Sequence, residues 1–125
     1  MTNEAKKRLL VVDDERGFRE YIRDAAGGLG YEVEMATNGL EAREIYKRFQ
    51  PDVILLDVVM PEADGVEFTR WLALQQTKAR IILVTGYNPH YADSTGKLAT
   101  ALGIPGITYL TKPLRLATLS AALAA

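Results

Sequence analysis

The stretch DVILLD, residues 52–57, places four consecutive apolar residues between two aspartates. An apolar run of this length, without polar alternation, is typical of a strand that is buried on both faces of a parallel sheet. Asp57 follows the run directly, so the sequence predicts a carboxylate at the carboxyl end of a buried strand. The neighbouring strands and the role of Asp57 have to be inferred from the rest of the sequence.

Four other short runs contain leucine or β-branched residues, which strands favour. Together with the first, they predict five strands near residues 8–13, 32–36, 52–57, 80–85 and 107–111. Helical periodicity marks segments between them, for example in Phe18, Ile22, Ala25 and Leu29, which recur every three or four residues. This alternation predicts the α/β class, with a doubly wound, five-stranded parallel sheet and helices on both faces.

The bulk composition is that of an ordinary globular chain. Its 125 residues suit one domain spanning 1–125, and 15 basic against 16 acidic side chains leave a net charge of −1 with both signs scattered. The absence of cysteine excludes a disulfide framework and thiolate metal sites. No signal-peptide pattern or membrane-spanning apolar run is present. We therefore expect a cytoplasmic protein that binds neither nucleic acid nor membrane.

Polar side chains follow several of the expected strands. In doubly wound sheets, ligands collect where the carboxyl ends of the strands meet. The sequence places Asp13, Asp14, Asp57, Thr85 and Lys112 at those ends. Three carboxylates in a small volume raise one another's pKa values unless a cation lies among them, and oxygen ligands without histidine or cysteine suit Mg²⁺ or Mn²⁺. We therefore predict a divalent metal site at Asp13, Asp14 and Asp57.

A metal, a lysine and a hydroxyl around one carboxylate suit a phosphoryl group. An aspartate can act as the nucleophile and form an aspartyl phosphate, while the metal and lysine neutralise charge on the phosphoryl oxygens. We infer that Asp57 is the phospho-acceptor and that Lys112 and Thr85 contact the transferred group. Taken separately, Asp13 and Asp14 would more often cap a helix, so the combination carries the inference.

Four motifs occur in order along the chain: VVDDE (11–15), LLDVVMPEADG (55–65), LVTG (83–86) and YLTKP (109–113). In these motifs the chain closely resembles the receiver domain of two-component response regulators. The resemblance covers nearly the whole chain and implies a flavodoxin-like fold with strand order 2-1-3-4-5. It also implies that Asp57 takes a phosphoryl group from a histidine kinase or a phosphotransfer protein.

The resemblance implies further roles around Asp57. Mg²⁺ would be held by Asp14, Asp57 and the backbone carbonyl of Val59, with Asp13 assisting through water. The resemblance also places a lysine on the phosphoryl group, which suits Lys112.

The same family pattern implies a switch. A cis peptide bond before Pro113 would hold Lys112 in position. The hydroxyl of Thr85 would move toward the phosphoryl group, and the ring of Tyr109 would turn inward behind it, so that phosphorylation shifts an existing equilibrium. By itself, Tyr109 is equally well explained as a half-buried strand aromatic.

The chain departs from the family pattern in two places. The segment between Thr85 and Lys112 is longer than expected and is interrupted by prolines and glycines, which predicts a fourth helix that is short or displaced. This puts in doubt the family's usual output surface, formed by helix four, strand five and helix five. Val59 and Tyr87 occupy positions that influence dephosphorylation, and neither is a general base at neutral pH. We therefore expect a phosphorylated form that lasts minutes or longer.

The expected output is protein–protein contact, with no enzyme activity beyond self-phosphorylation and slow self-dephosphorylation. The signal would be read by a downstream protein or by an output domain outside these residues. We expect a monomer that associates weakly, if at all, when phosphorylated.

Three alternatives stay open at this point. A phosphatase of the haloacid-dehalogenase type also uses an aspartate nucleophile with Mg²⁺, but its motif needs a second acid at the place of Val59. A flavodoxin-type electron carrier would need hydroxyls and free backbone N–H groups where this chain has the acidic loop DDERG, residues 13–17. A phosphorylation-independent adaptor would have no need of the intact acidic residues.

Overall fold

The computed structural model describes residues 6–57, 64–86, 96–104 and 106–124 of the chain. The strands are β1 (Arg8–Val12), β2 (Glu32–Ala36), β3 (Val53–Asp57), β4 (Arg80–Thr85) and β5 (Ile107–Thr111). The helices are α1 (Arg16–Gly28), α2 (Gly39–Phe49), α3 (Asp64–Leu74) and α5 (Leu116–Ala124), and residues 96–101 are also helical. The five predicted strands are confirmed, with bounds that differ by one residue in β1 and in β3.

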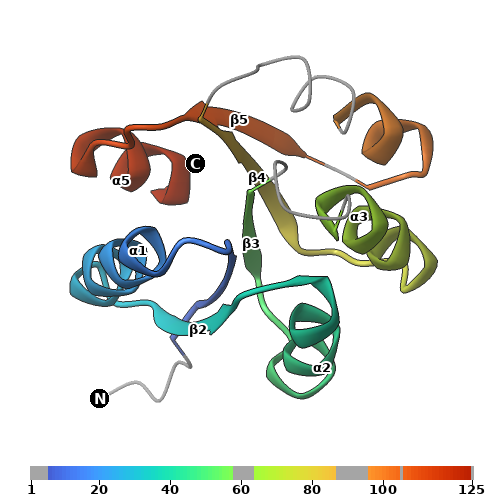
Figure 1. Ribbon diagram of the computed structural model, residues 1–125, viewed down its shortest axis with the longest axis horizontal. Coiled ribbons are helices and arrows are strands. Elements are labelled where there is room, and N and C mark those ends of the chain that lie inside the picture. The colour runs from blue at the N-terminus through green and yellow to red at the C-terminus, as the bar shows by residue number, and fades with distance from the viewer. Residues whose placement is uncertain (1–5, 58–63, 87–95, 105, 125) are drawn as a thin grey trace.

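The five strands form one parallel sheet in the order β2-β1-β3-β4-β5, which confirms the predicted topology. Helices α1 and α5 cover one face of this sheet, and α2, α3 and the helical segment 96–101 cover the other (Figure 1). Strand β3 lies at the centre, between β1 and β4. All five of its residues are buried, as expected for an apolar strand covered on both sides.

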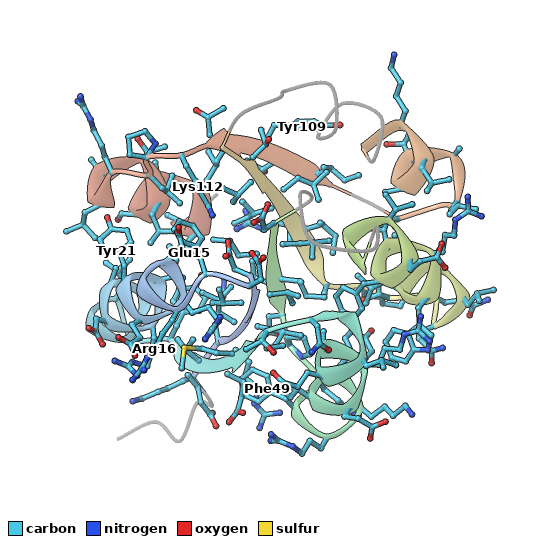
Figure 2. All side chains as sticks on the ribbon, viewed as in Figure 1. Glu15, Arg16, Tyr21, Phe49, Tyr109 and Lys112 are labelled. Atoms are coloured by element: carbon cyan, nitrogen blue, oxygen red, sulfur yellow. The ribbon has the colours of Figure 1, made fainter. Side chains whose placement is uncertain are left out.

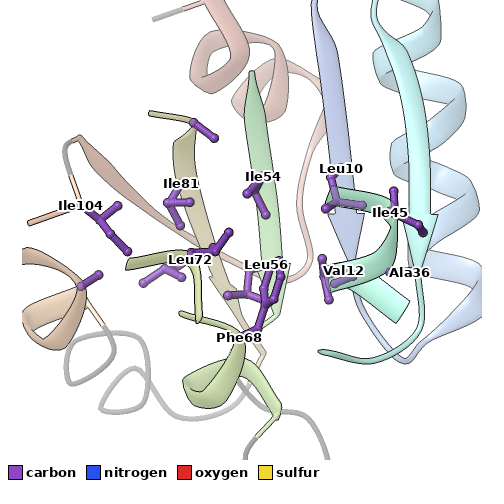
Figure 3. Close-up of a cluster of buried hydrophobic side chains, with 14 of the residues drawn as sticks. Leu10, Val12, Ala36, Ile45, Ile54, Leu56, Phe68, Leu72, Ile81 and Ile104 are labelled. Atoms are coloured by element: carbon purple, nitrogen blue, oxygen red, sulfur yellow. The ribbon is translucent and has the colours of Figure 1, made fainter. Parts of the chain in front are cut away.

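Two apolar clusters hold the layers together. Alternate residues of β3 point to opposite faces, so Ile54 and Leu56 join the cluster under α2 and α3, while Val53 and Leu55 join the cluster under α1 and α5. Figure 3 shows the first cluster, in which Phe68 of α3 packs near the end of β3. Because β3 is anchored from both sides, the position of Asp57 at its end is firmly set.

Helix α2 begins and ends where the sequence signals lie. The side chain of Asn38 accepts a hydrogen bond from the backbone N–H of Glu41 at 2.9 Å, and the carboxylate of Glu41 accepts one from the backbone N–H of Thr37 at 2.7 Å. The first bond satisfies an N–H group that the helix start leaves without a partner, and the second ties the residue before the cap to the first turn. At the other end, Gln50 adopts a left-handed conformation with φ 50°, followed by Pro51.

Within the described residues, the fourth helix comprises residues 96–101, and the segment before it, with Pro89, lies outside them. The predicted shortening or displacement of this helix therefore stays a prediction. In the part of the chain that the structure describes, no helix has the length and apolar character needed to cross a membrane.

Candidate functional site

Three carboxylates meet at the carboxyl ends of β1 and β3. Val12 pairs with Leu56, so Asp13 and Asp57 are neighbours at the ends of adjacent strands. Asp14 completes the group, and one carboxylate oxygen from each of the three residues lies within 4.8 Å of the other two. Asp13 is fully buried and Asp57 is 5% exposed, whereas Asp14 is exposed. The structure thus brings together the three acids that the sequence predicts as metal ligands.

The carboxylate of Asp13 is held in place by its neighbours. Its Oδ1 atom accepts a hydrogen bond from the backbone N–H of Glu15 at 2.7 Å. The guanidinium of Arg19 donates to the backbone carbonyl of Asp13 at 2.9 Å, and the Asp13 N–H donates to the carbonyl of Ala36 at 3.1 Å. The Oδ2 atom is buried, has no hydrogen-bond partner of good geometry among the described residues, and faces the ammonium of Lys112.

Lys112 supplies the positive charge of this site. Its Nζ atom lies 3.0 Å from Oδ2 of Asp13, 3.6 Å from Oδ2 of Asp57 and 3.8 Å from Oε1 of Glu15. The contact with Asp13 is the shortest of the three ion pairs. Burial by itself lowers the pKa of Lys112, but Asp13, then Asp57 and Glu15, more than offset this, so the pKa lies above its ordinary value. Lys112 therefore stays charged throughout the physiological range.

Backbone contacts position Lys112 beside Asp13 and Asp57. Its N–H donates to the carbonyl of Thr85 at 2.9 Å, which continues the pairing of β5 with β4 by one residue. The Lys112–Pro113 peptide bond is cis, as the family resemblance implies. Figure 2 shows the Lys112 side chain pointing toward Glu15, between α1 and α5.

An open pocket of about 760 Å³ gives access to Asp57. Acidic, aromatic and basic side chains line it, among them Asp14, Glu15, Phe18, Tyr21, Asp57 and Lys112. The pocket lies between the start of α1 and the loop that connects β5 with α5. Asp57 is therefore almost fully buried and still lines an open pocket.

Thr85 and Tyr109 lie on neighbouring strands. Thr85 is 2% exposed and pairs with Thr111, and it follows Val84, the strand partner of Asp57. Tyr109, two residues before Thr111, is on the same sheet face as Thr85 because side chains alternate along a strand. Its side chain is 48% exposed, and its hydroxyl packs against Gly96 so closely that a Cβ at Gly96 would overlap it.

Some features of the site escape sequence reasoning, and others lie beyond the described residues. Glu15 and Phe18 both contact Lys112, a partner far away in the chain, and only their place after the acidic pair hints at this. Val59 and Tyr87, which the family pattern connects with metal binding and dephosphorylation, lie outside the described residues.

The residues present fit a hard divalent cation. They offer carboxylate oxygens without nitrogen or sulfur donors, which Mg²⁺ and Mn²⁺ prefer, and Oδ2 of Asp13 is a buried acceptor without a good hydrogen bond. The carboxylates of Asp13, Glu15 and Asp57 lie within 3.8 Å of the Lys112 ammonium, and the carboxylate of Asp14 lies beside those of Asp13 and Asp57. A divalent ion would balance this excess negative charge.

Residues 9–124 match the model of one family, the response regulator receiver domain. The chain is 38% identical over 114 residues to the response regulator MprA of Mycobacterium leprae, which covers 91% of this chain and 48% of that protein. It thus spans about half the length of the curated relatives it matches.

Solved structures agree with the family match. The chemotaxis protein CheY4 of Vibrio cholerae has a TM-score of 0.83 and 31% identity, covering 96% of this chain and 98% of that one. A response regulator from Colwellia psychrerythraea has a TM-score of 0.82 and 27% identity, with 96% and 95% covered.

Proposed function

The chain belongs to the response regulator receiver domain family, and on that premise we propose that Asp57 is the residue that accepts the phosphoryl group. One observation carries this proposal: a carboxylate that is 5% exposed ends the central strand, opens onto a pocket and lies 3.6 Å from the ammonium of Lys112. We also propose that residues 1–125 act as one receiver unit.

In the proposed reaction, a carboxylate oxygen of Asp57 forms a bond to phosphorus while the bond from phosphorus to the donor's imidazole nitrogen breaks. The electron pair of that bond stays with the imidazole, and the transferred group ends as an aspartyl phosphate. Asp13, Asp14 and Asp57 would hold Mg²⁺, which neutralises charge on the phosphoryl oxygens when bound. Lys112 would contribute a charge-assisted hydrogen bond to one of those oxygens.

Signal output would begin at Thr85 and Tyr109. A new hydrogen bond from the Thr85 hydroxyl to the phosphoryl group exists only in the phosphorylated form, so it favours one of two arrangements of the fold. The exposed ring of Tyr109, on the same face of the sheet, is placed to report that change.

The natural donor would be a histidine kinase or a phosphotransfer protein, and the reader a downstream protein or an output domain. The monomeric state, with weak association after phosphorylation, and the cytoplasmic location stay predictions. The family match favours this reading over the phosphatase and electron-carrier alternatives. The adaptor alternative is decided by the experiment below.

The test is the intact mass of the protein after incubation with acetyl phosphate. We expect wild type to gain one phosphoryl group with Mg²⁺ and none with a chelator, and Asp57→Asn to gain none. Asp52→Asn is the matched control, because Asp52 directly precedes β3 at the end opposite to Asp57, where it accepts a hydrogen bond from the N–H of Arg8 at 2.8 Å. This control variant should be phosphorylated like wild type.

Absence of any phosphoryl gain in wild type, from acetyl phosphate and from kinases alike, would contradict the proposal and favour the adaptor. A gain that persists in Asp57→Asn would place the acceptor elsewhere. The decay of the wild-type adduct tests the expected lifetime of minutes or longer, and loss within seconds would contradict that expectation.

A further inference from the structure

The ammonium of Lys112 lies over an aromatic ring as well as among carboxylates. Its Nζ atom is 4.2 Å from the centre of the Phe18 ring. Phe18 belongs to the first turn of α1, is 8% exposed and packs into the apolar cluster under α1 and α5. The same ring lines the pocket that contains Asp57. A cation within about 6 Å of a ring centre is attracted by the negative face of the ring.

The proposed reaction changes the carboxylate partners of Lys112 but leaves the Phe18 ring unchanged. Asp13 and Asp57 would both bind Mg²⁺, and Asp57 would also become phosphorylated. Their attraction for the ammonium therefore changes during the reaction. Glu15 has a side chain that is 66% exposed, where solvent screens its charge. Phe18 neither ionises nor binds a metal, so its attraction for the ammonium persists through the reaction.

We propose that Phe18 is a positioning residue, whose ring face holds the ammonium of Lys112 where the incoming phosphoryl group needs it. This inference rests on the proposed function of Asp57 as phospho-acceptor. It assigns to Phe18 an electrostatic role in addition to the apolar packing that its periodicity predicts. The two roles make different predictions, because packing depends on the shape of the ring and cation binding depends on its charge distribution.

The chain provides a matched control in Phe49. Arg8 lies over the Phe49 ring at 5.6 Å, and Phe49 is 5% exposed, so this pair is also a buried ring facing a cation. Phe49 ends α2 and lies well apart from Lys112 (Figure 2). Changes to its ring should affect stability but not phosphorylation.

The main experiment replaces Phe18 with phenylalanines that carry one, three and five ring fluorines, which weaken and then reverse the negative face with little change in shape. We expect the rate of Asp57 phosphorylation by acetyl phosphate to fall stepwise, by about two- to fivefold across the series. The same series at Phe49 should leave the rate unchanged. Urea unfolding of each variant verifies that it is folded.

A flat rate across the Phe18 series, in folded protein that still gains phosphate, would overturn this inference and leave the proposed function standing. An equal fall in the Phe49 series would also overturn it. A wild-type protein that gains no phosphate would instead contradict the proposed function, and this inference with it.

A second measurement needs no phosphorylation. Ring currents from Phe18 should shift the NMR signals of the terminal methylene protons of Lys112 away from those of an exposed lysine, in protein without Mg²⁺. Phe18→Leu should abolish this shift, and Phe49→Leu should preserve it. An unshifted Lys112 signal in wild type would overturn the proposed contact.

Discussion

Strands β3 and β5 both carry site residues at their carboxyl ends, but they differ sharply in burial. All five residues of β3 are buried between two neighbouring strands, whereas none of the five residues of β5 is buried. Strand β5 is an edge strand and pairs only with β4 among the described strands. From this difference we predict that Asp57 keeps its position while the strand that bears Tyr109 can rearrange at low cost.

The largest effect we expect is a difference in stability between variants of the two strands. Leu56→Ala in β3 removes a fully buried side chain and should lower the free energy of unfolding by about 2–5 kcal/mol. Leu110→Ala, the matched change in β5, removes a partly buried side chain and should cost less than about 2 kcal/mol. Urea unfolding of both variants measures the difference. Equal losses of stability would contradict this expectation, because β5 would then be anchored as firmly as β3.

A smaller effect concerns the contact between Gly96 and Tyr109. Replacing glycine by alanine within a helix usually stabilises a protein by about 0.5–1 kcal/mol, which we expect for Gly27→Ala in α1, where the added Cβ meets nothing. At Gly96 the Cβ would overlap the Tyr109 hydroxyl, so Gly96→Ala should destabilise by about 1–3 kcal/mol and displace the ring.

The double variant Gly96→Ala with Tyr109→Ala separates this clash from any effect on the helix itself. Removal of the ring should restore most of the loss caused by Gly96→Ala, as a double-mutant cycle would reveal. A stabilising Gly96→Ala would mean that Tyr109 is already free to move away.

The smallest effect follows from the raised pKa of Lys112. A group whose pKa is higher in the folded protein contributes stability that is complete below its unfolded pKa of 10.5 and is lost as the pH rises through the folded value. The free energy of unfolding of wild type should therefore fall more steeply above pH 10.5 than that of Lys112→Met. From about pH 7 up to that pH, where the carboxylates stay ionised, the difference between the two proteins should stay constant. An identical pH dependence would mean that the acids do not hold the ammonium.

Much of the fold follows from local patterns in the sequence. Short runs of the residues that strands favour predict all five strands, and the alternation with helices predicts the parallel sheet. The bounds differ only at Asp13 and Asp52, which flank their strands rather than belong to them. Polar residues at strand ends predict that Asp13, Asp14, Asp57 and Lys112 come together, because parallel strands end at one edge of a sheet.

Contacts between distant segments could not be predicted in this way. Periodicity assigns Phe18 to the buried side of a helix, but whether its ring meets Lys112 depends on the angle at which α1 crosses the sheet. Likewise, the sequence suggests only that Gly96 interrupts a helix, whereas in the fold its missing side chain leaves space for the Tyr109 hydroxyl. The functional roles of Thr85 and Tyr109 stay predictions from the family resemblance.

The most direct test of the division between β3 and β5 is amide hydrogen exchange before and after phosphorylation of Asp57. We predict slow, unchanged exchange in β3 and greater protection in β5 around Tyr109 as its ring turns inward. Phosphorylated Thr85→Ala should lack the response in β5. A response confined to β3, or no response in β5 of the phosphorylated wild type, would contradict the account.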